Sequence, residues 1–460
     1  MADSITACVA ATPQEDPVTE FDTVVIGAGV SGLTAARLLT QAGQRVVVLE
    51  ARDRVGGRTW TDRSTGRATD RGASWIHGIT DSPLDEITTA LGMRKIEFTV
   101  GGYQVDSRPI AYYGPDATRL SDEAAAAFAA DVHSLDARLV EVIAASTPGS
   151  SYGDVVETAL AAEVDHGWSA DRAERVREYL RHRSEEQYGV WIDQLDAHGL
   201  DDDQVDGDEV VFPDGYDVLA TSLAEGLDVR LNHIVTRVDW APQGATVSTS
   251  DESFTASQAI ITVPVGVLKS PSFTIDPALP EPLSGALERL EMNHFEKVFL
   301  EFPTKFWDED VYAIRRQGPA SKRWHSWYDL SALHGTPTLL TFAAGPTAIE
   351  IQDSVADSVL ASLREIYGDR VPEPTQVHIT DWQDDPFAHG SYAYMTVGSV
   401  PEDHDVLATP VDGVLHLAGE ATWTDDPATV TAALMSGHRA AEHVLGAEVS
   451  LSALPGQLPR

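Results

Sequence analysis

A glycine-rich turn between a buried strand and a helix is the feature that most constrains this fold. Residues 22–26 are a short apolar, β-branched run, and residues 33–42 have the apolar spacing of a helix. Residues 45–49 form a second apolar run, closed by Glu50 at the spacing of about 20 positions expected for an acidic residue that binds ribose hydroxyls. The turn between the first strand and the helix is Gly27-Ala28-Gly29-Val30-Ser31-Gly32. Its three glycines permit the tight turn, the approach of a pyrophosphate and close helix–strand packing, so the sequence predicts a dinucleotide-binding βαβ unit.

The rest of the chain alternates between helical and strand patterns. Its 460 residues exceed one typical domain and predict two. Helical periodicity is expected near 120–145, 154–188 and 428–445, and an acidic stretch at 201–209 predicts a solvated loop. Strands are expected at 229–240, 245–250, 259–263, 297–302 and 414–417.

Charge limits the partners of this chain. It carries 32 basic and 72 acidic residues, a net charge of −40. Phosphate binding needs a basic surface, so no nucleic-acid partner is expected, and an anionic membrane surface is disfavoured for the same reason. The acidity has two interpretations that can hold together: solubility, including adaptation to salt, or attraction of a cationic substrate.

A single cysteine, Cys8, lies in a polar segment, 1–21, that we interpret as a flexible lead. A disulfide within the chain and a cysteine-rich metal site are therefore excluded, and no metal site is predicted. No run of 18 apolar residues indicates a membrane helix, and the first 20 residues lack the pattern of a secretory signal. A cytoplasmic location is the default expectation.

Further segments distinguish between the possible dinucleotides. Residues 50–58, EARDRVGGR, resemble the extension found in flavoproteins of the amine oxidase family, and residues 417–420, LAGE, resemble that family's second FAD contact. The similarity extends from about residue 22 to about residue 445, and polyamine oxidases are the members that the chain resembles best. Other segments matching in order are 72–78, GASWIHG; 296–303, EKVFLEFP; 390–394, GSYAY; and 428–430, ATV.

The resemblance implies an FAD-dependent oxidase. The cysteine to which monoamine oxidases attach their flavin has no counterpart, so the FAD is expected to be non-covalent. Glu420 is expected to contact the ribityl chain, and the helix after it to point its N-terminus at the flavin pyrimidine ring, where its dipole favours the anionic reduced flavin. The residues expected to bind FAD are Gly27, Gly29, Val30, Ser31, Gly32, Glu50, Ala51, Arg52, Gly57, Arg58, Gly72, Ala73, Ser74, Trp75, Val235, Trp382, Gly419, Glu420, Thr429 and Val430.

In this family the flavin takes hydride from the carbon next to an amine nitrogen, the imine is hydrolysed, and molecular oxygen reoxidises the flavin to give hydrogen peroxide. Lys297 matches the lysine that holds a water near the flavin N5 atom. A lowered pKa would let Lys297 exchange protons with that water. The alternative is a surface lysine that protects an edge strand from aggregation.

Three further residues are expected to meet the substrate. His77 matches a substrate-facing histidine of several polyamine oxidases, and Tyr392 matches one wall of an aromatic cage. The opposite wall is a second aromatic residue in monoamine oxidases but Thr429 here, as in spermine oxidases and flavin histone demethylases. The alternatives are a histidine satisfied elsewhere near the cofactor and a core tyrosine.

Acidic residues along a tunnel would suit a polyamine, which carries several ammonium groups. Glu185, Glu186 and Asp193 are candidates by location, although a solvated helix face is the favoured interpretation of each. The expected substrate is a cationic amine used together with oxygen. The sequence leaves open which amine is used, which C–N bond is cleaved and what the oligomeric state is.

The expected fold is α/β, with an FAD-binding Rossmann-like domain of the GR2 type, a mixed sheet with helices, interleaved with an α+β substrate domain. The FAD domain is expected at 22–94, 209–289 and 405–448, the substrate domain at 95–208 and 290–404, and flexible tails at 1–21 and 449–460.

Two other functions remain open from the sequence. An L-amino acid oxidase needs an arginine to grip the substrate carboxylate; Arg181 and Arg183 exist, but no motif assigns either. A monoamine oxidase is the other enzyme alternative. The non-enzyme alternative is a flavin-binding scaffold or a chromatin-associated protein.

Overall fold

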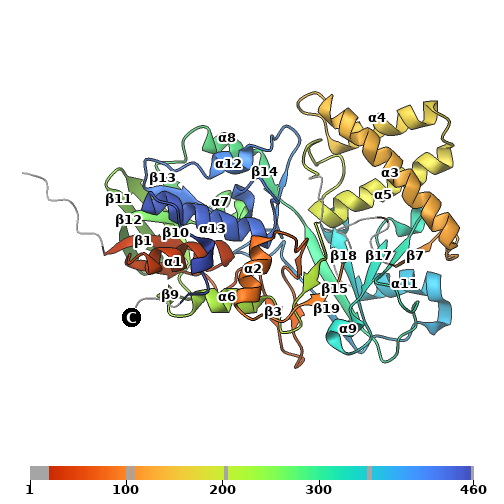
Figure 1. The fold of residues 1–460 in the computed structure, drawn as a ribbon, viewed down its shortest axis with the longest axis horizontal. Helices are drawn as coiled ribbons and strands as arrows, with labels where there is room; N and C mark the ends of the chain where they lie inside the picture. The colour runs from red at the N-terminus through yellow and green to blue at the C-terminus, as the bar shows by residue number, and fades with distance from the viewer. Residues whose placement is uncertain (1–19, 100–104, 106–108, 201–205, 350–354, 457–460) are drawn as a thin grey trace, which may run out of the picture.

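Two large β-sheets organise the chain (Figure 1), for which the computed structural model describes residues 20–99, 105, 109–200, 206–349 and 355–456. Cys8 and most of the predicted lead at 1–21 lie outside the described residues. The sheets belong to opposite halves of the molecule, and helices cover both. This arrangement is the predicted mixed α/β class.

The first sheet contains the predicted βαβ unit. Parallel pairs join β1 to β2, β2 to β9, β1 to β12 and β12 to β21, while β10, β11 and β12 are antiparallel neighbours. Its strand order is β13-β10-β11-β12-β1-β2-β9, with β21 also paired to β12. The bounds are β1 Phe21–Ile26, β2 Val46–Leu49, β9 Val229–Arg230, β10 Val235–Ala241, β11 Gly244–Thr249, β12 Ser253–Ile261, β13 Thr274–Asp276 and β21 Leu415–Leu417.

Two helices from opposite ends of the chain cover this sheet side by side, α1 (Val30–Gln41) and α13 (Val430–Leu445) (Figure 1). Their contact is close because a glycine lies in it: a Cβ atom added to Gly437 would fall 2.1 Å from the carbonyl oxygen of Ser31. The Ser31 and Ser436 hydroxyls are 3.1 Å apart at the same contact. The glycine-rich turn and the last long helix are therefore packed as one unit.

The second sheet has the order β19-β15-β18-β17-β16-β7. Alternation along β15 divides its residues between the two faces: Val298 and Leu300 pack in the core that includes α11, whereas Phe299 packs in a core on the opposite face. Lys297 shares the face of Phe299 because it lies two residues away. The bounds are β7 Ile110–Tyr113, β15 Phe295–Glu301, β16 Ala313–Arg316, β17 Ser326–Asp329, β18 Thr338–Ala344, β19 Gln376–Ile379 and α11 Val355–Tyr367.

Three helices, α3 (Asp122–Ala144), α4 (Tyr152–Asp165) and α5 (Ala170–Tyr188), gather beside the second sheet (Figure 1). The predicted helical stretch 154–188 is thus two helices. Gly167, at φ +107°, ends the first, and the Ser169 side chain caps the second by accepting a hydrogen bond from the Arg172 N–H at 3.2 Å.

A small sheet of β5 (Trp75–Ile76), β8 (Val210–Val211) and β6 (Ile96–Glu97) lies between the large ones. The antiparallel register pairs Trp75 with Val211 and Ile76 with Val210. Continuing this register by one residue brings His77 opposite Glu209.

The C-terminal segment departs from the expectation of a flexible tail at 449–460, within the part that the structure describes. Leu454 is fully buried, and the Arg37 guanidinium donates hydrogen bonds to the carbonyl oxygens of Leu454, at 2.6 Å, and Gly456, at 2.7 Å. Residues 451–456 are therefore packed against α1. The predicted domain boundaries remain a prediction.

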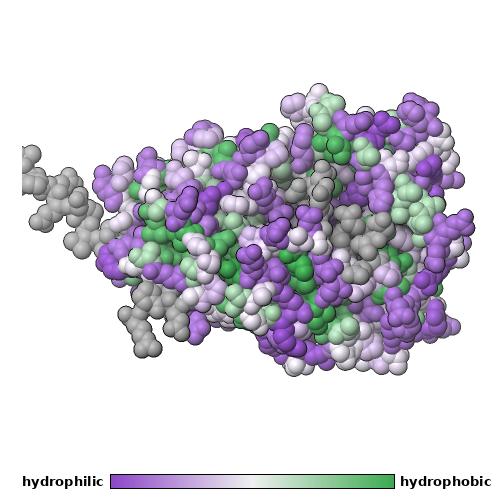
Figure 2. Space-filling model, viewed as in Figure 1, coloured by the Kyte–Doolittle hydropathy of each residue, from purple (hydrophilic) through white to green (hydrophobic). Residues whose placement is uncertain are grey.

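The visible surface is mainly hydrophilic, with scattered apolar patches (Figure 2). Within the described part of the chain, no helix combines the length and the apolar character needed to cross a bilayer.

Candidate active site

One cavity is lined by residues of the second large sheet, by residues just beyond strands β1, β12 and β21 of the first sheet, and by the ends of α1, α5 and α13. It brings together segments that are hundreds of residues apart in the chain. The predicted site residues that line it are Gly29, Val30, Ser31, Arg58, Gly72, Ala73, Ser74, Trp75, His77, Lys297, Trp382, Tyr392, Gly419, Glu420, Thr429 and Val430. The predicted residues that do not line it are Gly27, Gly32, Glu50, Ala51, Arg52, Gly57 and Val235.

The glycine-rich turn has the backbone geometry that its sequence demands. Gly27 has φ +103°, and a Cβ atom on Gly32 would lie 2.1 Å from the Gly27 carbonyl oxygen. A Cβ atom on Gly29, in contrast, would meet no protein atom within 4 Å. Gly29 also lines the cavity. Gly27 and Gly32 thus form the turn, whereas Gly29 leaves space that a pyrophosphate can enter.

Glu50 braces this turn from the end of β2. Its side chain accepts hydrogen bonds from the backbone N–H groups of Ala28, at 2.7 Å, and Arg52, at 2.9 Å. The residue is only 5% exposed. Val235 begins β10 and is buried in the apolar core of the first sheet.

An ion pair joins the two motifs that suggested a flavin. The Arg58 guanidinium donates to a Glu420 carboxylate oxygen at 2.7 Å and to the Ser391 carbonyl oxygen at 3.1 Å. The second oxygen of Glu420, Oε2, is buried and has no hydrogen-bond partner among the described residues. A buried acceptor without a donor is costly, so this oxygen fits a donor supplied by a bound molecule, such as a ribityl hydroxyl.

The N-terminus of α13 also reaches the cavity. Thr429 is its N-cap: the hydroxyl accepts from the Ala432 N–H at 3.0 Å and donates to the Asp426 carbonyl oxygen at 2.7 Å. Val430 and Thr431, in the first turn, line the cavity. The partial positive charge of this helix end favours negative charge placed there.

Lys297 is buried, at 7% exposure, and β15 is an interior strand between β18 and β19. The alternative of a surface lysine on an edge strand is therefore wrong. Its ammonium group donates to the carbonyl oxygens of Asp70, at 3.2 Å, and Gly72, at 2.6 Å, and to the Ser74 hydroxyl at 2.5 Å. Burial lowers the pKa of Lys297, and the Asp70 carboxylate opposes that shift. A water held by this lysine remains a prediction.

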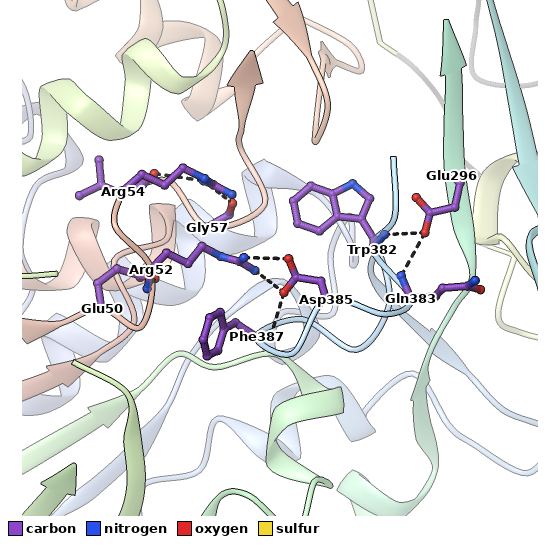
Figure 3. Close-up of polar contacts among 10 residues, drawn as sticks. Glu50, Arg52, Arg54, Gly57, Glu296, Trp382, Gln383, Asp385 and Phe387 are labelled. Carbon is purple, nitrogen blue, oxygen red and sulfur yellow. Dashed lines mark hydrogen bonds and ion pairs between the residues drawn. The ribbon is translucent and has the colours of Figure 1, made fainter. Parts of the chain in front are cut away.

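Glu296, the neighbour of Lys297, holds the segment that carries Trp382 (Figure 3). Glu296 accepts hydrogen bonds from the Thr380 hydroxyl at 2.5 Å and from the backbone N–H groups of Trp382, at 2.6 Å, and Gln383, at 3.0 Å. Burial raises the pKa of Glu296 to about 7. The Trp382 indole N–H donates to the Arg71 carbonyl oxygen at 3.0 Å, which fixes this ring at the cavity.

The segment that follows Trp382 is bound to the loop that contains Gly56 and Gly57 (Figure 3). Arg52 makes two hydrogen bonds of 2.7 Å to the Asp385 carboxylate, and Asp385 also accepts from the Phe387 N–H at 2.8 Å. Arg54 donates to the Gly57 carbonyl oxygen at 2.9 Å. Arg52, Arg54 and Gly57 thus stabilise this loop without lining the cavity.

Four aromatic rings form one continuous wall of the cavity. Tyr392 lies 5.7 Å from Phe295, Phe295 lies 4.7 Å from Phe342, and Phe342 lies 5.5 Å from Tyr328, between ring centroids. All four line the cavity. The Tyr392 hydroxyl donates to the Gln187 carbonyl oxygen at 2.9 Å. Aromatic faces of this kind attract cations and exclude water.

His77 reaches the cavity with a buried carboxylate behind it. Its Nδ1 atom is hydrogen-bonded to Glu209, which is 0% exposed. The Trp75 ring lies nearly parallel to the His77 ring, with 6.4 Å between the ring centroids. The interpretation of 201–209 as a solvated loop is therefore wrong for Glu209, because the β5–β8 register buries it; residues 201–205 lie outside the described residues.

The acidic residues of α5 also differ from the expectation. The side chains of Glu185 and Glu186 are 6% and 5% exposed, so the solvated interpretation is wrong for both. They lie on the side of α5 that faces the sheet. Asp193 is exposed, as favoured from the sequence.

Several cavity residues were not expected from the sequence: Phe295, Phe342, Tyr328, Gln187, Tyr188 and Asp426. Phe295 had a signal, since it lies two residues before Lys297 on one face of a strand. Phe342 had none, because it reaches the site through pairing opposite Lys297 in the neighbouring strand.

Comparison with known proteins places this site in context. Residues 30–445 match the model of a family described as flavin containing amine oxidoreductase. Lysine-specific histone demethylase 1 homolog 1 of Oryza sativa subsp. japonica is 33% identical over 452 residues, covering 92% of this chain and 52% of that protein. This chain therefore spans about half the length of that relative.

Polyamine oxidase 4 of Oryza sativa subsp. japonica is 32% identical over 433 residues, covering 91% of this chain and 87% of that protein. Among solved structures, a mutant of a putrescine oxidase matches with a TM-score of 0.74 at 24% identity, covering 93% of this chain and 99% of that one. Similarity at that identity shows the shared fold.

Proposed function

This chain belongs to the family of flavin-containing amine oxidoreductases, and we propose that it is an FAD-dependent oxidase of polyamines. The reaction would convert an amine, oxygen and water into an aldehyde, a shortened amine and hydrogen peroxide. One observation carries the proposal: a glycine-rich turn, a buried lysine and an aromatic wall line one cavity.

The residues present fit a non-covalent FAD. Gly29 would admit the pyrophosphate, the unpartnered oxygen of Glu420 would accept from the ribityl chain, and the N-terminus of α13 would face the pyrimidine ring. The bound flavin would supply the hydride acceptor and the reaction with oxygen. The FAD domain is proposed at 22–94, 209–289 and 405–448, with the substrate domain at 95–208 and 290–404.

The remaining roles belong to the chain's own side chains. The wall that ends at Tyr392 would hold the amine and exclude water, with Thr429 leaving a wider and more polar slot on the opposite side. His77, fixed by Glu209, would meet a polar group of the substrate. Lys297 would position a water and exchange a proton with it, aided by its lowered pKa.

An L-amino acid oxidase is disfavoured by the cavity's arginines. Arg58 is paired with Glu420, and Arg71 is paired with Asp62 and lies 5.1 Å from the Trp60 ring centroid. Neither is placed to grip a substrate carboxylate from the aromatic wall. Arg181 and Arg183 do not line the cavity.

A second candidate substrate is a methylated lysine side chain. The similarity to a histone demethylase homologue favours it, and the same C–N oxidation would apply. The net charge of −40 leaves a cationic peptide as the chromatin component that suits this chain.

The test is a peroxide-release assay on the flavin-loaded protein. The panel is spermine, spermidine, N-acetylated polyamines, putrescine, benzylamine, several L-amino acids and a dimethyl-lysine peptide. We expect activity concentrated on the polyamines. Activity confined to the peptide would replace the polyamine by the second candidate, and activity confined to amino acids or monoamines would overturn both.

A further inference from the structure

A row of buried ionisable groups lies behind the aromatic wall. The last two turns of α5 place His182, Glu185 and Glu186 against His325, the residue before β17. The histidines are 5% and 4% exposed, and the two glutamate side chains 6% and 5%. Buried ionisable groups are costly unless they are partnered, so their arrangement calls for a role.

Tyr328 and three residues of this group form a chain of contacts that runs inward from the cavity. The Tyr328 hydroxyl, at the cavity wall, donates to Glu186 Oε2 at 2.5 Å. Glu186 Oε1 lies 3.2 Å from His325 Nδ1, and His325 Nε2 lies 3.4 Å from Glu185 Oε2. Each ring nitrogen of His325 therefore faces a different carboxyl group. Tyr328, Glu186, His325 and Glu185 are called the buried row below.

Hydrogen bonds at both ring nitrogens of His325 would need shared protons. A neutral imidazole has one N–H group and one acceptor nitrogen. With a carboxyl group on each side, either one carboxyl group carries a proton and donates it, or the ring carries two and both carboxyl groups are ionised. The two states have the same total charge and differ only in where one proton lies.

The pKa shifts around the row favour the state in which a carboxyl group carries the shared proton and the His325 ring is neutral. Burial raises the pKa of Glu186 to about 7 and that of Glu185 to about 8, and lowers that of His325 to about 3. The charge of Arg315, on β16, lowers the pKa of Glu186 and also that of His325. The charges of Arg181 and the exposed Lys322 lower the pKa of Glu185, so this end of the row lies toward an exposed cation.

The geometry disfavours a metal ion as the reason for this group. Ligand atoms of His182, Glu185 and His325 lie within 4.8 Å of one another. The two imidazole rings, however, are stacked 3.8 Å apart at an interplanar angle of 5°. Lone pairs of imidazole nitrogens lie in the ring planes, and parallel planes do not converge on one ion. His182 also has a pKa lowered first by burial, so it packs as a neutral ring.

Building on the proposed amine oxidation, we propose that the buried row is a proton relay that removes a proton from the ammonium form of the substrate. A substrate N–H proton passes to the Tyr328 oxygen while the tyrosine proton moves to Glu186. The Glu186 proton moves to His325, and the His325 proton moves to Glu185, which releases it to solvent. No electrons move in these steps. Glu185, Glu186 and His325 are thus positioning residues that act through Tyr328.

The experiment follows flavin reduction by spermine under anaerobic conditions from pH 6 to 10, with Tyr328→Phe, His325→Gln and Glu185→Gln. Without the relay, the amine must arrive already neutral. We expect the acidic limb of the rate profile to move up by about one pH unit, which is about a tenfold loss near neutral pH, with wild-type rates regained at high pH. Glu185→Asp keeps a carboxylate and should restore most of the rate.

The matched control is His182→Phe, which keeps a stacked ring but removes the imidazole nitrogens, and its profile should match the wild type. An unchanged profile in the three relay variants, or a loss of equal size at every pH, would overturn the relay. Stoichiometric Zn²⁺ binding by the wild type that disappears in His182→Phe would overturn it in favour of a metal site.

A second measurement keeps the relay separate from the proposed function. If no amine reduces the wild-type flavin, the proposed function fails. In that case, ¹⁵N spectra of the histidine rings still report on proton sharing. We expect the His325 ring signals, assigned by their loss in His325→Gln, to titrate in one step that moves in Glu185→Gln. Ring signals that do not change with pH would contradict the relay.

Discussion

The two sides of the cavity are built from different parts of the polypeptide. The side expected to hold the nucleotide is made largely of backbone: a turn in which Gly27 has φ +103°, an open face at Gly29 and the first turn of α13. The opposite side is made of side chains, four aromatic rings with a row of buried acids and a histidine behind them. The shape of the turn is set by a few glycines. The shape and charge of the side-chain wall, in contrast, change with each residue that is substituted.

This difference predicts how the two sides respond to substitution. On the nucleotide side, changes should act on cofactor binding and on stability. On the amine side, they should act on rate and on pH dependence while the flavin stays bound. The following experiments test that division.

The largest expected effect is on turnover. Replacing Lys297 with methionine keeps a long apolar stem but removes the three donors that meet Asp70, Gly72 and Ser74. We expect the peroxide-release rate to fall by at least about 100-fold, the range for loss of an acid–base group, with the flavin spectrum retained. Lys305→Met, on a partly exposed lysine outside the cavity, is the control. Loss of flavin would make Lys297 part of the cofactor side instead.

Two glycine variants test the separate roles of Gly32 and Gly29 in the glycine-rich turn. Gly32→Ala places a methyl group 2.1 Å from the Gly27 carbonyl oxygen and should lower the free energy of unfolding by about 1–3 kcal/mol as well as flavin affinity. Gly29→Ala meets no protein atom within 4 Å, so it should lower flavin affinity with little change in stability. Thermal melts of the flavin-free proteins, with flavin titrations, distinguish the two effects. Equal loss of stability in both variants would contradict this assignment.

Glu296 provides a test of pH dependence. Its pKa of about 7 in the folded state lies above the usual carboxyl value, so the folded state holds its proton more tightly than the unfolded state does. Stability from this group is therefore present at low pH and is lost as pH rises toward 7. Glu296→Gln cannot ionise and can still accept from two N–H groups. We expect it to gain about 1 kcal/mol or more over the wild type between pH 5 and pH 8 in denaturant melts.

The smallest expected effect concerns the cap of α13. Thr429→Ala removes the side-chain acceptor of the Ala432 N–H and should lower the free energy of unfolding by about 1 kcal/mol. Thr429→Ser keeps the cap and should match the wild type in melts. A change in substrate preference with serine, where only a methyl group is lost, would show that Thr429 also shapes the slot on the amine side.

Sequence reasoning was effective where the signal was local. The strand, glycine turn and helix at 21–41 follow from adjacent residues, as does the strand at 297–302, whose alternation places Lys297 on one face. The resemblance added His77 and Tyr392, which the structure places at the cavity.

The missed features depend on pairing between distant segments. Glu209 was expected in solvent because its neighbours are acidic, yet β5–β8 pairing buries it against His77. Glu185 and Glu186 follow a charged helical sequence that looks solvated, and only the packing of α5 against the second sheet shows that they are buried. Phe342 becomes a wall residue through its cross-strand position alone.

The contact between α1 and α13 has a consequence for synthesis of the protein on the ribosome. The first sheet pairs β12 with β21, and the glycine-rich turn packs against Gly437, so the support of this turn depends on residues made long after it. A nascent chain that has emerged only as far as α11 holds the turn near its beginning but lacks the surface that supports it. Cofactor capture should therefore follow the emergence of α13, and until then the apolar face of α1 is a surface for chaperones to shield.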